Sequence, residues 1–291
     1  MMPSSYNKSN ARKPYTITVV SGKGGVGKTN TACNLAVTLA SYGKKVLLFD
    51  ADLGLASIDV LFGILPRFTI QDLMEGRCST ADVLMEGPGG IRILPATSGA
   101  ADMADLNSDD SAKISELLHE IGRTFDFVLI DAPSGIAENM QRMADIADEV
   151  LLITTPEPTA IMDAYAVTKI LSARNPDQPL NLLVNMISEQ DTGERVSSGF
   201  NEVVLKFLDR EIETIGQVPY DPCVPLAVRR QQAFSVCYPD CPAARSLRLL
   251  TLRLLSRSTQ GAACVAEKNP WSYAGSTGVN RVATWLGPKK Q

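Results

Sequence analysis

A glycine-rich segment near the start of the chain has the residue types and spacing of a phosphate-binding loop. It reads Ser-Gly-Lys-Gly-Gly-Val-Gly-Lys-Thr and contains the Walker A pattern Gly-x-x-x-x-Gly-Lys-Thr. Glycines let backbone N–H groups turn around phosphate oxygens, and the N-terminus of a following helix adds its positive dipole end. Lys28 can reach the β- and γ-phosphates of a nucleotide, and the Thr29 hydroxyl can ligate Mg²⁺. The candidate nucleotide-binding residues are Gly22, Lys23, Gly24, Gly25, Val26, Gly27, Lys28, Thr29 and Asn30.

Acidic residues follow two later apolar runs. Asp50 and Asp52 stand two residues apart in the segment Phe-Asp-Ala-Asp-Leu-Gly, and Asp131 opens the segment Asp-Ala-Pro-Ser-Gly. Ligands of α/β proteins bind outside the carboxyl ends of the strands, so these carboxylates are placed to meet the phosphates. Asp131 fits the Walker B position, which holds Mg²⁺. Each aspartate alone also fits a helix cap or a turn.

Short apolar runs alternate with longer amphipathic stretches along most of the chain. The runs are rich in Val, Ile and Leu, which is typical of strands buried on both faces. We expect strands at residues 16–20, 45–49, 91–94, 127–130, 150–154, 180–186 and 213–218. We expect helices at residues 29–42, 111–123, 160–173, 196–208 and 243–257, with Phe200, Val203, Val204, Phe207 and Leu208 on one face. The alternation predicts an α/β fold: one domain with a mostly parallel, doubly wound sheet and helices on both faces.

Composition limits the remaining possibilities. The 291 residues carry 28 basic and 32 acidic side chains and a net charge of −4, so no global basic excess suggests direct nucleic-acid binding. No apolar run reaches the roughly 18 residues of a membrane span, and the N-terminus has no signal-peptide core, so we expect a cytoplasmic protein. His119, the only histidine, is expected on a helix surface. The cysteines lack ligand spacing and are expected to be structural or incidental thiols: Cys33, Cys78, Cys223, Cys237, Cys241 and Cys264.

Lys23, early in the loop, makes the segment resemble the deviant Walker A motif of the MinD/ParA ATPases. The resemblance implies that ATP and Mg²⁺ drive two subunits to sandwich two nucleotides, with Lys23 crossing to the partner's nucleotide. It assigns Asp52 to the attacking water near Mg²⁺, which makes Lys23, Lys28 and Asp52 the catalytic candidates and Thr29, Asp52 and Asp131 the metal candidates. It also offers Asn185, Pro219, Tyr220 and Asp221 for the base, and Glu157 and Asp163 as dimer-switch partners of Lys23. Asn185 equally fits the cap of a turn.

Four further segments resemble the flagellar-number branch of this superfamily, the FlhG, FleN and YlxH ATPases. They are FDADLGLASIDVLFG (residues 49–63), GRC (residues 76–78), GPGGIRILPATS (residues 87–98) and PEPTAIMDAYA (residues 156–166). The similarity covers about residues 15–257. The resemblance implies an ATP-dependent homodimer that restrains flagellar biogenesis. Its implied partners are a flagellar transcription activator, the FlhF-type GTPase or C-ring proteins. Residues 1–14 lack the DQAxxLR-type segment of the members that stimulate the GTPase.

The chain ends differ in composition from the rest. We expect a flexible arm at residues 1–14, the ATPase domain at 15–258 and a loosely ordered basic tail at 259–291. The tail carries Trp271 and Trp285 among basic residues, so weak contact with the inner face of the cell membrane or the cell pole is one expectation and simple disorder another. The rival functions are a MinD-type division-site regulator and a ParA-type partition ATPase. An iron–sulfur carrier would need paired cysteines, which the sequence lacks.

Overall fold

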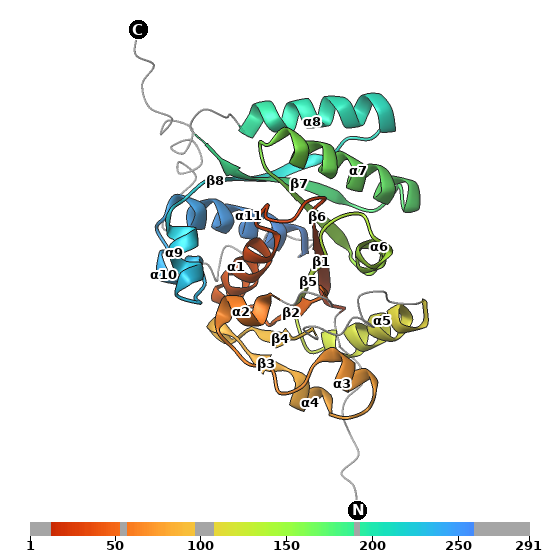
Figure 1. Ribbon diagram of the computed structural model, residues 1–291, viewed down its shortest axis with the longest axis vertical. Helices are drawn as coiled ribbons and strands as arrows, with labels where there is room; N and C mark the ends of the chain where they lie inside the picture. The colour runs from red at the N-terminus through yellow and green to blue at the C-terminus, as the bar shows by residue number, and fades with distance from the viewer. Residues whose placement is uncertain (1–12, 53–56, 97–107, 189–192, 259–291) are drawn as a thin grey trace, which may run out of the picture.

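A single eight-stranded sheet runs through the part of the chain that the computed structural model describes, residues 13–52, 57–96, 108–188 and 193–258 (Figure 1). The spatial order is β3-β4-β2-β5-β1-β6-β7-β8, and all neighbouring strands are parallel except the pair β3 and β4. The strands are Tyr15–Val20 (β1), Val46–Asp50 (β2), Met85–Glu86 (β3), Arg92–Leu94 (β4), Phe127–Asp131 (β5), Glu149–Thr154 (β6), Leu180–Ile187 (β7) and Glu213–Pro219 (β8). The mostly parallel sheet confirms the predicted fold class.

Helices cover both faces of this sheet. One face carries Lys28–Ser41 (α1), Ile58–Phe62 (α2), Cys223–Arg229 (α9), Phe234–Cys237 (α10) and Pro242–Ser258 (α11). The other carries Ile70–Met74 (α3), Thr80–Val83 (α4), Ser108–Gly122 (α5), Glu138–Asp145 (α6), Pro158–Arg174 (α7) and Gly193–Leu208 (α8). Successive strand residues serve opposite faces: Leu48 packs in the first core and Phe49 in the second. This alternation gives the sheet two apolar cores, as the Val-, Ile- and Leu-rich runs predict.

The seven predicted strands and five predicted helices are present, with ends moved by three residues or fewer. The short elements α2, α3, α4, α6, α9, α10 and β3 were not predicted. The expectation for α8 is partly wrong, because Phe200 and Val204 are buried while Val203 and Phe207 are exposed. His119 is exposed on α5, as predicted. Residues 1–12 and 259–291 lie outside the described residues, and so do the expectations for the arm, the tail and Cys264.

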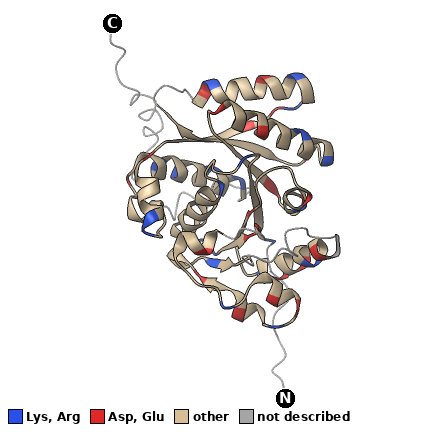
Figure 2. Cartoon of the chain, in the orientation of Figure 1, with Lys and Arg blue, Asp and Glu red and all other residues tan. Residues whose placement is uncertain are grey.

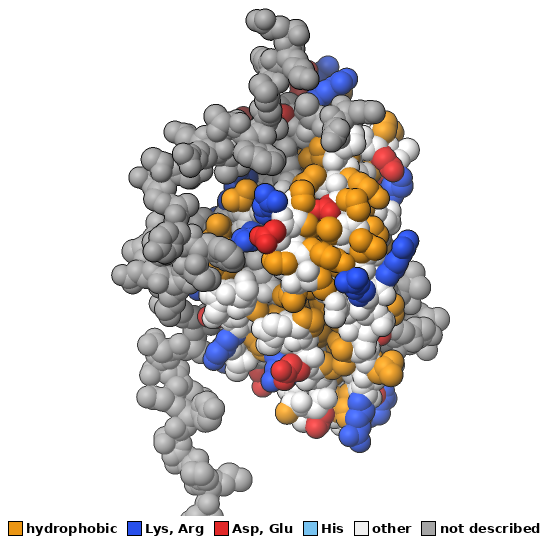
Figure 3. Space-filling model, turned by 90° about the vertical axis from the view of Figure 1, so that its left-hand side faces the viewer, with side chains coloured by type: hydrophobic (Ala, Val, Ile, Leu, Met, Phe, Trp, Pro, Cys, Tyr) orange, Lys and Arg blue, Asp and Glu red, His pale blue; other side chains and the backbone are white. Residues whose placement is uncertain are grey.

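The surface of the described residues mixes charge with apolar side chains. Lys and Arg are interspersed with Asp and Glu over the helices (Figure 2). Apolar side chains gather on the face that includes α2, α9 and α10 (Figure 3). Exposed apolar residues of these helices include Val60, Leu226 and Val236. No helix among the described residues is both long and apolar enough to cross a bilayer.

A buried carboxylate anchors the end of α11 to the sheet. Glu149 of β6 is 1% exposed and accepts hydrogen bonds from the Tyr15 hydroxyl, the Asn181 amide and the Arg257 guanidinium at 2.6, 2.7 and 2.8 Å. The same guanidinium pairs with Glu213, which is exposed. Arg257 is therefore the cation that neutralises Glu149.

Replacing Arg257 with alanine should lower the free energy of unfolding by about 3 kcal/mol, because the buried Glu149 would lose its cation. Glu213→Ala removes only the exposed partner of the same guanidinium and should cost about 0–1 kcal/mol. Urea denaturation of both variants measures the difference. Equal losses for the two variants would show that the buried Glu149 does not depend on Arg257.

Candidate nucleotide site

The phosphate loop occupies the turn between β1 and α1. β1 ends at Val20, and α1 begins at Lys28 with Gly27 as its N-cap residue in the left-handed conformation, at φ +89°. A side chain at this position would be strained, and its Cβ would lie 2.3 Å from Nδ2 of Asn185. Gly22 is equally confined, since a Cβ there would lie 2.3 Å from the backbone of Asp163 on α7. The loop is thus fitted closely against β7 and α7.

The ends of three neighbouring strands bring the predicted cation and carboxylate together. β2, β5 and β1 are adjacent and parallel, with Asp50 opposite Asp131 and Asp131 opposite Val19. The Lys28 ammonium donates to Oδ1 of Asp131 at 2.7 Å, and the Thr29 hydroxyl donates to Oδ2 at 2.7 Å. Both members of the ion pair are buried, at 6% and 0% exposure. The structure therefore joins three of the predicted site residues in one contact.

The Asp50 carboxylate is bound by backbone N–H groups of its own chain. Its carboxylate accepts backbone N–H groups from Asp52 at 3.2 Å, Ser57 at 2.9 Å and Ile58 at 3.1 Å. Burial, and then the charge of Asp131, raise the pKa of Asp50 to about 7. Burial also raises the pKa of Asp131, against the opposing effect of Lys28. Asp50 therefore holds the backbone at Asp52 and at the start of α2.

Asp52 itself lies half-buried two residues after the end of β2. Its charge contributes to raising the pKa of Asp131, so the two carboxylates are close enough to interact. A Ser57 hydroxyl donates to Thr29 Oγ1 at 3.3 Å, a contact that the sequence did not predict. Oxygen atoms from Thr29, Asp52 and Asp131 are the hard ligands that Mg²⁺ prefers, so the residues present fit this ion.

Lys23 lies on the outer side of the loop and pairs within its own chain. Its ammonium donates to Glu157 Oε2 at 2.7 Å and to Thr159 Oγ1 at 3.0 Å. The side chains of Lys23 and Glu157 are 39% and 65% exposed. Asp163, the other predicted switch partner, lies next to the loop through its backbone contact with Gly22. Thr159 was not predicted, although it belongs to the same PEPTAIMDAYA segment.

A cavity of about 460 Å³ opens beside the loop. Its walls are residues 23–26 of the loop, residues 155–157 after β6, and Met186 near the end of β7. Met186 has φ +56°, which is uncommon for a residue with a side chain. Strained residues of this kind cluster at active sites and ligand-binding sites. No sequence pattern indicated Met186, because neither its backbone conformation nor its place in the cavity leaves a motif.

The residues predicted for the base have partners within the chain. The Asn185 amide donates to the Val26 carbonyl at 2.8 Å and so holds the phosphate loop. Pro219 ends β8, and the exposed Tyr220 follows it. The Asp221 carboxylate is 5% exposed and accepts the N–H groups of Cys223 and Ala243. A contact of these side chains with a base stays a prediction.

The parallel sheet, the phosphate loop and the buried Lys28–Asp131 pair define a P-loop nucleotide-binding protein. The chain belongs to the CobQ/CobB/MinD/ParA nucleotide binding domain family, whose model matches residues 17–234. It is 39% identical over 238 residues to the antiactivator FleN of Pseudomonas aeruginosa, covering 82% of this chain and 85% of that protein. It is 30% identical over 270 residues to the flagellum site-determining protein YlxH of Helicobacter pylori, covering 92% and 90%.

A solved structure agrees with this assignment. The MinC:MinD cell division protein complex of Aquifex aeolicus contains a chain that superposes with a TM-score of 0.68 at 30% identity. The match covers 83% of this chain and 96% of that one. The predicted superfamily is therefore confirmed, and the flagellar branch is among the relatives found.

Proposed function

We propose that this chain is a Mg²⁺-dependent ATPase that dimerises when it binds ATP and regulates the number or placement of flagella. The observation that supports nucleotide hydrolysis best is the buried contact of Lys28 and Thr29 with Asp131 at the mouth of the phosphate loop. The 39% identity to an antiactivator over most of both chains supports the regulatory role.

Each residue has one part in this proposal. Lys28 leaves Asp131 and neutralises the phosphates. Thr29 and Asp131 hold Mg²⁺, which supplies charge neutralisation at the phosphates when it is bound. Asp52 orients the attacking water. Asn185 keeps the loop backbone in place through Val26, and Pro219 borders the position of the base.

In this proposal, dimerisation moves Lys23 from Glu157 of its own chain to the nucleotide of the second subunit. Its pair with Glu157 is exposed, so separating the two side chains costs only about 0–1 kcal/mol. A nucleotide phosphate of a second subunit offers Lys23 a stronger charge partner than Glu157, because charge-assisted bonds to phosphate in a site closed to water are strong. Release from Glu157 and Thr159 would accompany closure of the two subunits on their nucleotides.

Within this proposal, the ATP-bound dimer restrains flagellar biogenesis through a transcription activator, an FlhF-type GTPase or a C-ring protein. A direct contact with nucleic acid is not part of it. The protein would act in the cytoplasm, or at the inner face of the membrane or the cell pole. A MinD-type division-site function is the second candidate, because the chain is also 30% identical to the septum site-determining protein MinD of Helicobacter pylori.

Deleting the gene should change the number or position of flagella per cell, which electron microscopy counts directly. Complementation with the wild-type gene should restore the original count. The Lys28→Ala gene should not, because its product should bind ATP too weakly to form the ATP-bound dimer. An unchanged count together with misplaced septa would reject the flagellar role and favour the MinD-type function.

A further inference from the structure

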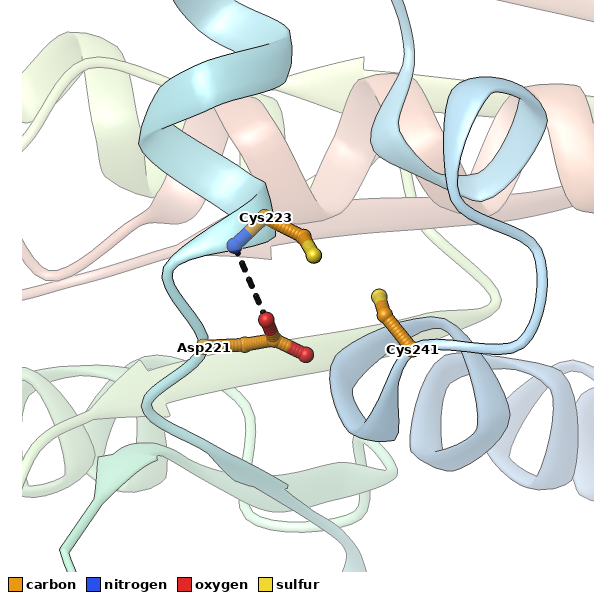
Figure 4. Close-up of side chains that lie close together, drawn as sticks. All are labelled: Asp221, Cys223 and Cys241. Atoms are coloured by element: carbon orange, nitrogen blue, oxygen red, sulfur yellow. Dashed lines mark hydrogen bonds between the residues drawn. The ribbon is translucent and has the colours of Figure 1, made fainter.

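Three side chains with metal-ligating atoms converge between the end of β8 and the start of α11. Asp221 and Cys223 lie at the turn into α9, and Cys241 directly precedes α11. The carboxylate oxygen and the two sulfur atoms all lie within 4.8 Å of one another. The side chains point toward a common centre (Figure 4). Cys223 and Cys241 are 18 positions apart in the sequence, so their spacing gave no sign of this arrangement.

The cluster is largely closed to solvent. Asp221 is 5% exposed and Cys241 is 9% exposed, while Cys223 is partly exposed. Each carboxylate oxygen accepts one backbone N–H, from Cys223 at 2.9 Å and from Ala243 at 3.1 Å. Without a cation, the Cys223 and Cys241 thiols also hydrogen-bond this carboxylate. A cation that replaces the two thiol protons would take the lone pairs that these protons occupy. Cys223 provides the side from which an ion can enter.

The surrounding backbone favours negative charge at the same place. The Ala243 N–H group belongs to the first turn of α11, and the next one, from Ala244, donates to Cys241 Sγ at 3.4 Å. The positive end of this 17-residue helix is therefore directed at the cluster. Two thiolates and one carboxylate around a divalent cation carry a net charge of −1, which this helix end stabilises.

We propose that Asp221, Cys223 and Cys241 form a binding site for a thiophilic divalent cation, in the first place Zn²⁺. Thiolate ligands select Zn²⁺ over Mg²⁺ or Ca²⁺, which prefer oxygen ligands. In a tetrahedral site with Zn–S bonds of about 2.3 Å, two sulfurs lie about 3.8 Å apart, so small side-chain rotations close the site. Three protein ligands leave the fourth position for water.

Binding of the cation would change both the thiols and the local structure. Burial, together with the charge of Asp221, raises the pKa of the Cys241 thiol to about 11, so without a cation it keeps its proton. Zn²⁺ displaces such protons when it binds. The bound ion would fasten the turn that follows Pro219, the last residue of β8, to the N-terminus of α11. A disulfide would use both sulfurs and leave the buried Asp221 carboxylate without a cation.

The test is a Zn²⁺ titration of the reduced, full-length, metal-free protein in competition with a chromophoric chelator. We expect one equivalent to bind. Cys241→Ser and Cys223→Ser should each weaken the apparent affinity more than about 100-fold. Loss of a ligand's hydrogen-bond partner alone costs about 10- to 100-fold, so loss of a ligand costs more. Cys237→Ser is the matched control, because its sulfur contacts Gln232 and lies outside the cluster; it should bind Zn²⁺ like the wild type.

Two further measurements distinguish Zn²⁺ binding at this cluster from Zn²⁺ binding elsewhere on the protein. Asp131→Ala should retain the Zn²⁺ equivalent, which excludes the carboxylates at the phosphate loop. Zn²⁺ should raise the melting temperature of the wild type and of Cys237→Ser, but not of Cys241→Ser, since a ligand stabilises only the state that binds it. The proposal is overturned if the reduced protein binds no stoichiometric Zn²⁺, or if Cys241→Ser binds it as tightly as the wild type. A Cys223–Cys241 disulfide in the isolated protein, with no Zn²⁺ binding after reduction, would assign the pair to thiol oxidation instead.

Discussion

Replacing Lys28 with alanine should reduce the affinity for ATP by at least about 30-fold. Lys28 is buried, so its ammonium would meet the phosphates in a place with little screening by water. Removing one member of a buried, hydrogen-bonded charge pair costs about 2–5 kcal/mol, and each 1.4 kcal/mol is a factor of ten in the equilibrium constant. Isothermal titration with ATP and Mg²⁺ measures the loss.

Lys23→Ala is the matched control for this experiment, since it removes the other lysine of the loop. Lys23 is exposed and paired with Glu157, so its loss should leave ATP binding to the isolated subunit nearly unchanged. Lys28→Ala should also lower the stability of the nucleotide-free protein, because the buried Asp131 carboxylate loses its cation; among the described residues, the Thr29 hydroxyl remains as its side-chain donor. If Lys28→Ala folds and still binds ATP like the wild type, the loop is not the phosphate site.

Replacing Asp52 with alanine should trap the protein as an ATP-bound dimer. A group that orients the attacking water is worth about 10²–10⁴ in rate, so phosphate release should fall by that factor. Lys28, Thr29 and Asp131 are unchanged, and ATP and Mg²⁺ should therefore still bind. The ATP that stays bound should also raise the melting temperature.

Phosphate release and gel filtration in ATP and Mg²⁺ decide this prediction together. Asp59→Ala is a suitable control, because Asp59 belongs to α2 and its carboxylate accepts the N–H of the adjacent Val60. Hydrolysis by Asp59→Ala should match the wild type. If Asp52→Ala hydrolyses ATP at the wild-type rate, or stays monomeric with ATP bound, the water is oriented by another group.

The long elements of the fold could be predicted because each carries its own hydrophobic pattern. β5 is apolar except at its last residue and β6 except at its terminal residues, and the apolar residues of α1 and α11 recur at helical spacing. The two-residue β3 is too short to show a period. α3 and α4 have four or five residues, although Thr69 with Asp72 and Ser79 with Asp82 form capping boxes that their spacing indicates.

The pattern on α8 shows the limit of periodicity. Phe200 with Val204 and Val203 with Phe207 both lie four residues apart, so each pair forms an apolar stripe. Only the first stripe packs against the core. Spacing therefore predicts the helix, but it does not decide which stripe the sheet covers.

The site also combines residues that a local motif predicts with residues that only the packing of distant segments brings together. The phosphate loop is a continuous motif, and Asp131 follows a recognisable strand, so their meeting could be predicted. The contact of Lys23 with Thr159, the backbone of Met186 and the meeting of Cys223 with Cys241 each depend on how distant segments pack. None of these has a pattern in the sequence, so the spacing of the cysteines alone indicates only structural or incidental thiols.

The molecular mass of the protein in solution, measured by light scattering with ATP and Mg²⁺ and again with ADP, tests the proposed switch most directly. The wild type should be a dimer with ATP and a monomer with ADP. Lys23→Ala should bind ATP but remain monomeric, because Lys23 is the residue expected to reach the partner's nucleotide. A wild type that stays monomeric with bound ATP, or a Lys23→Ala variant that dimerises as tightly as the wild type, would contradict the account.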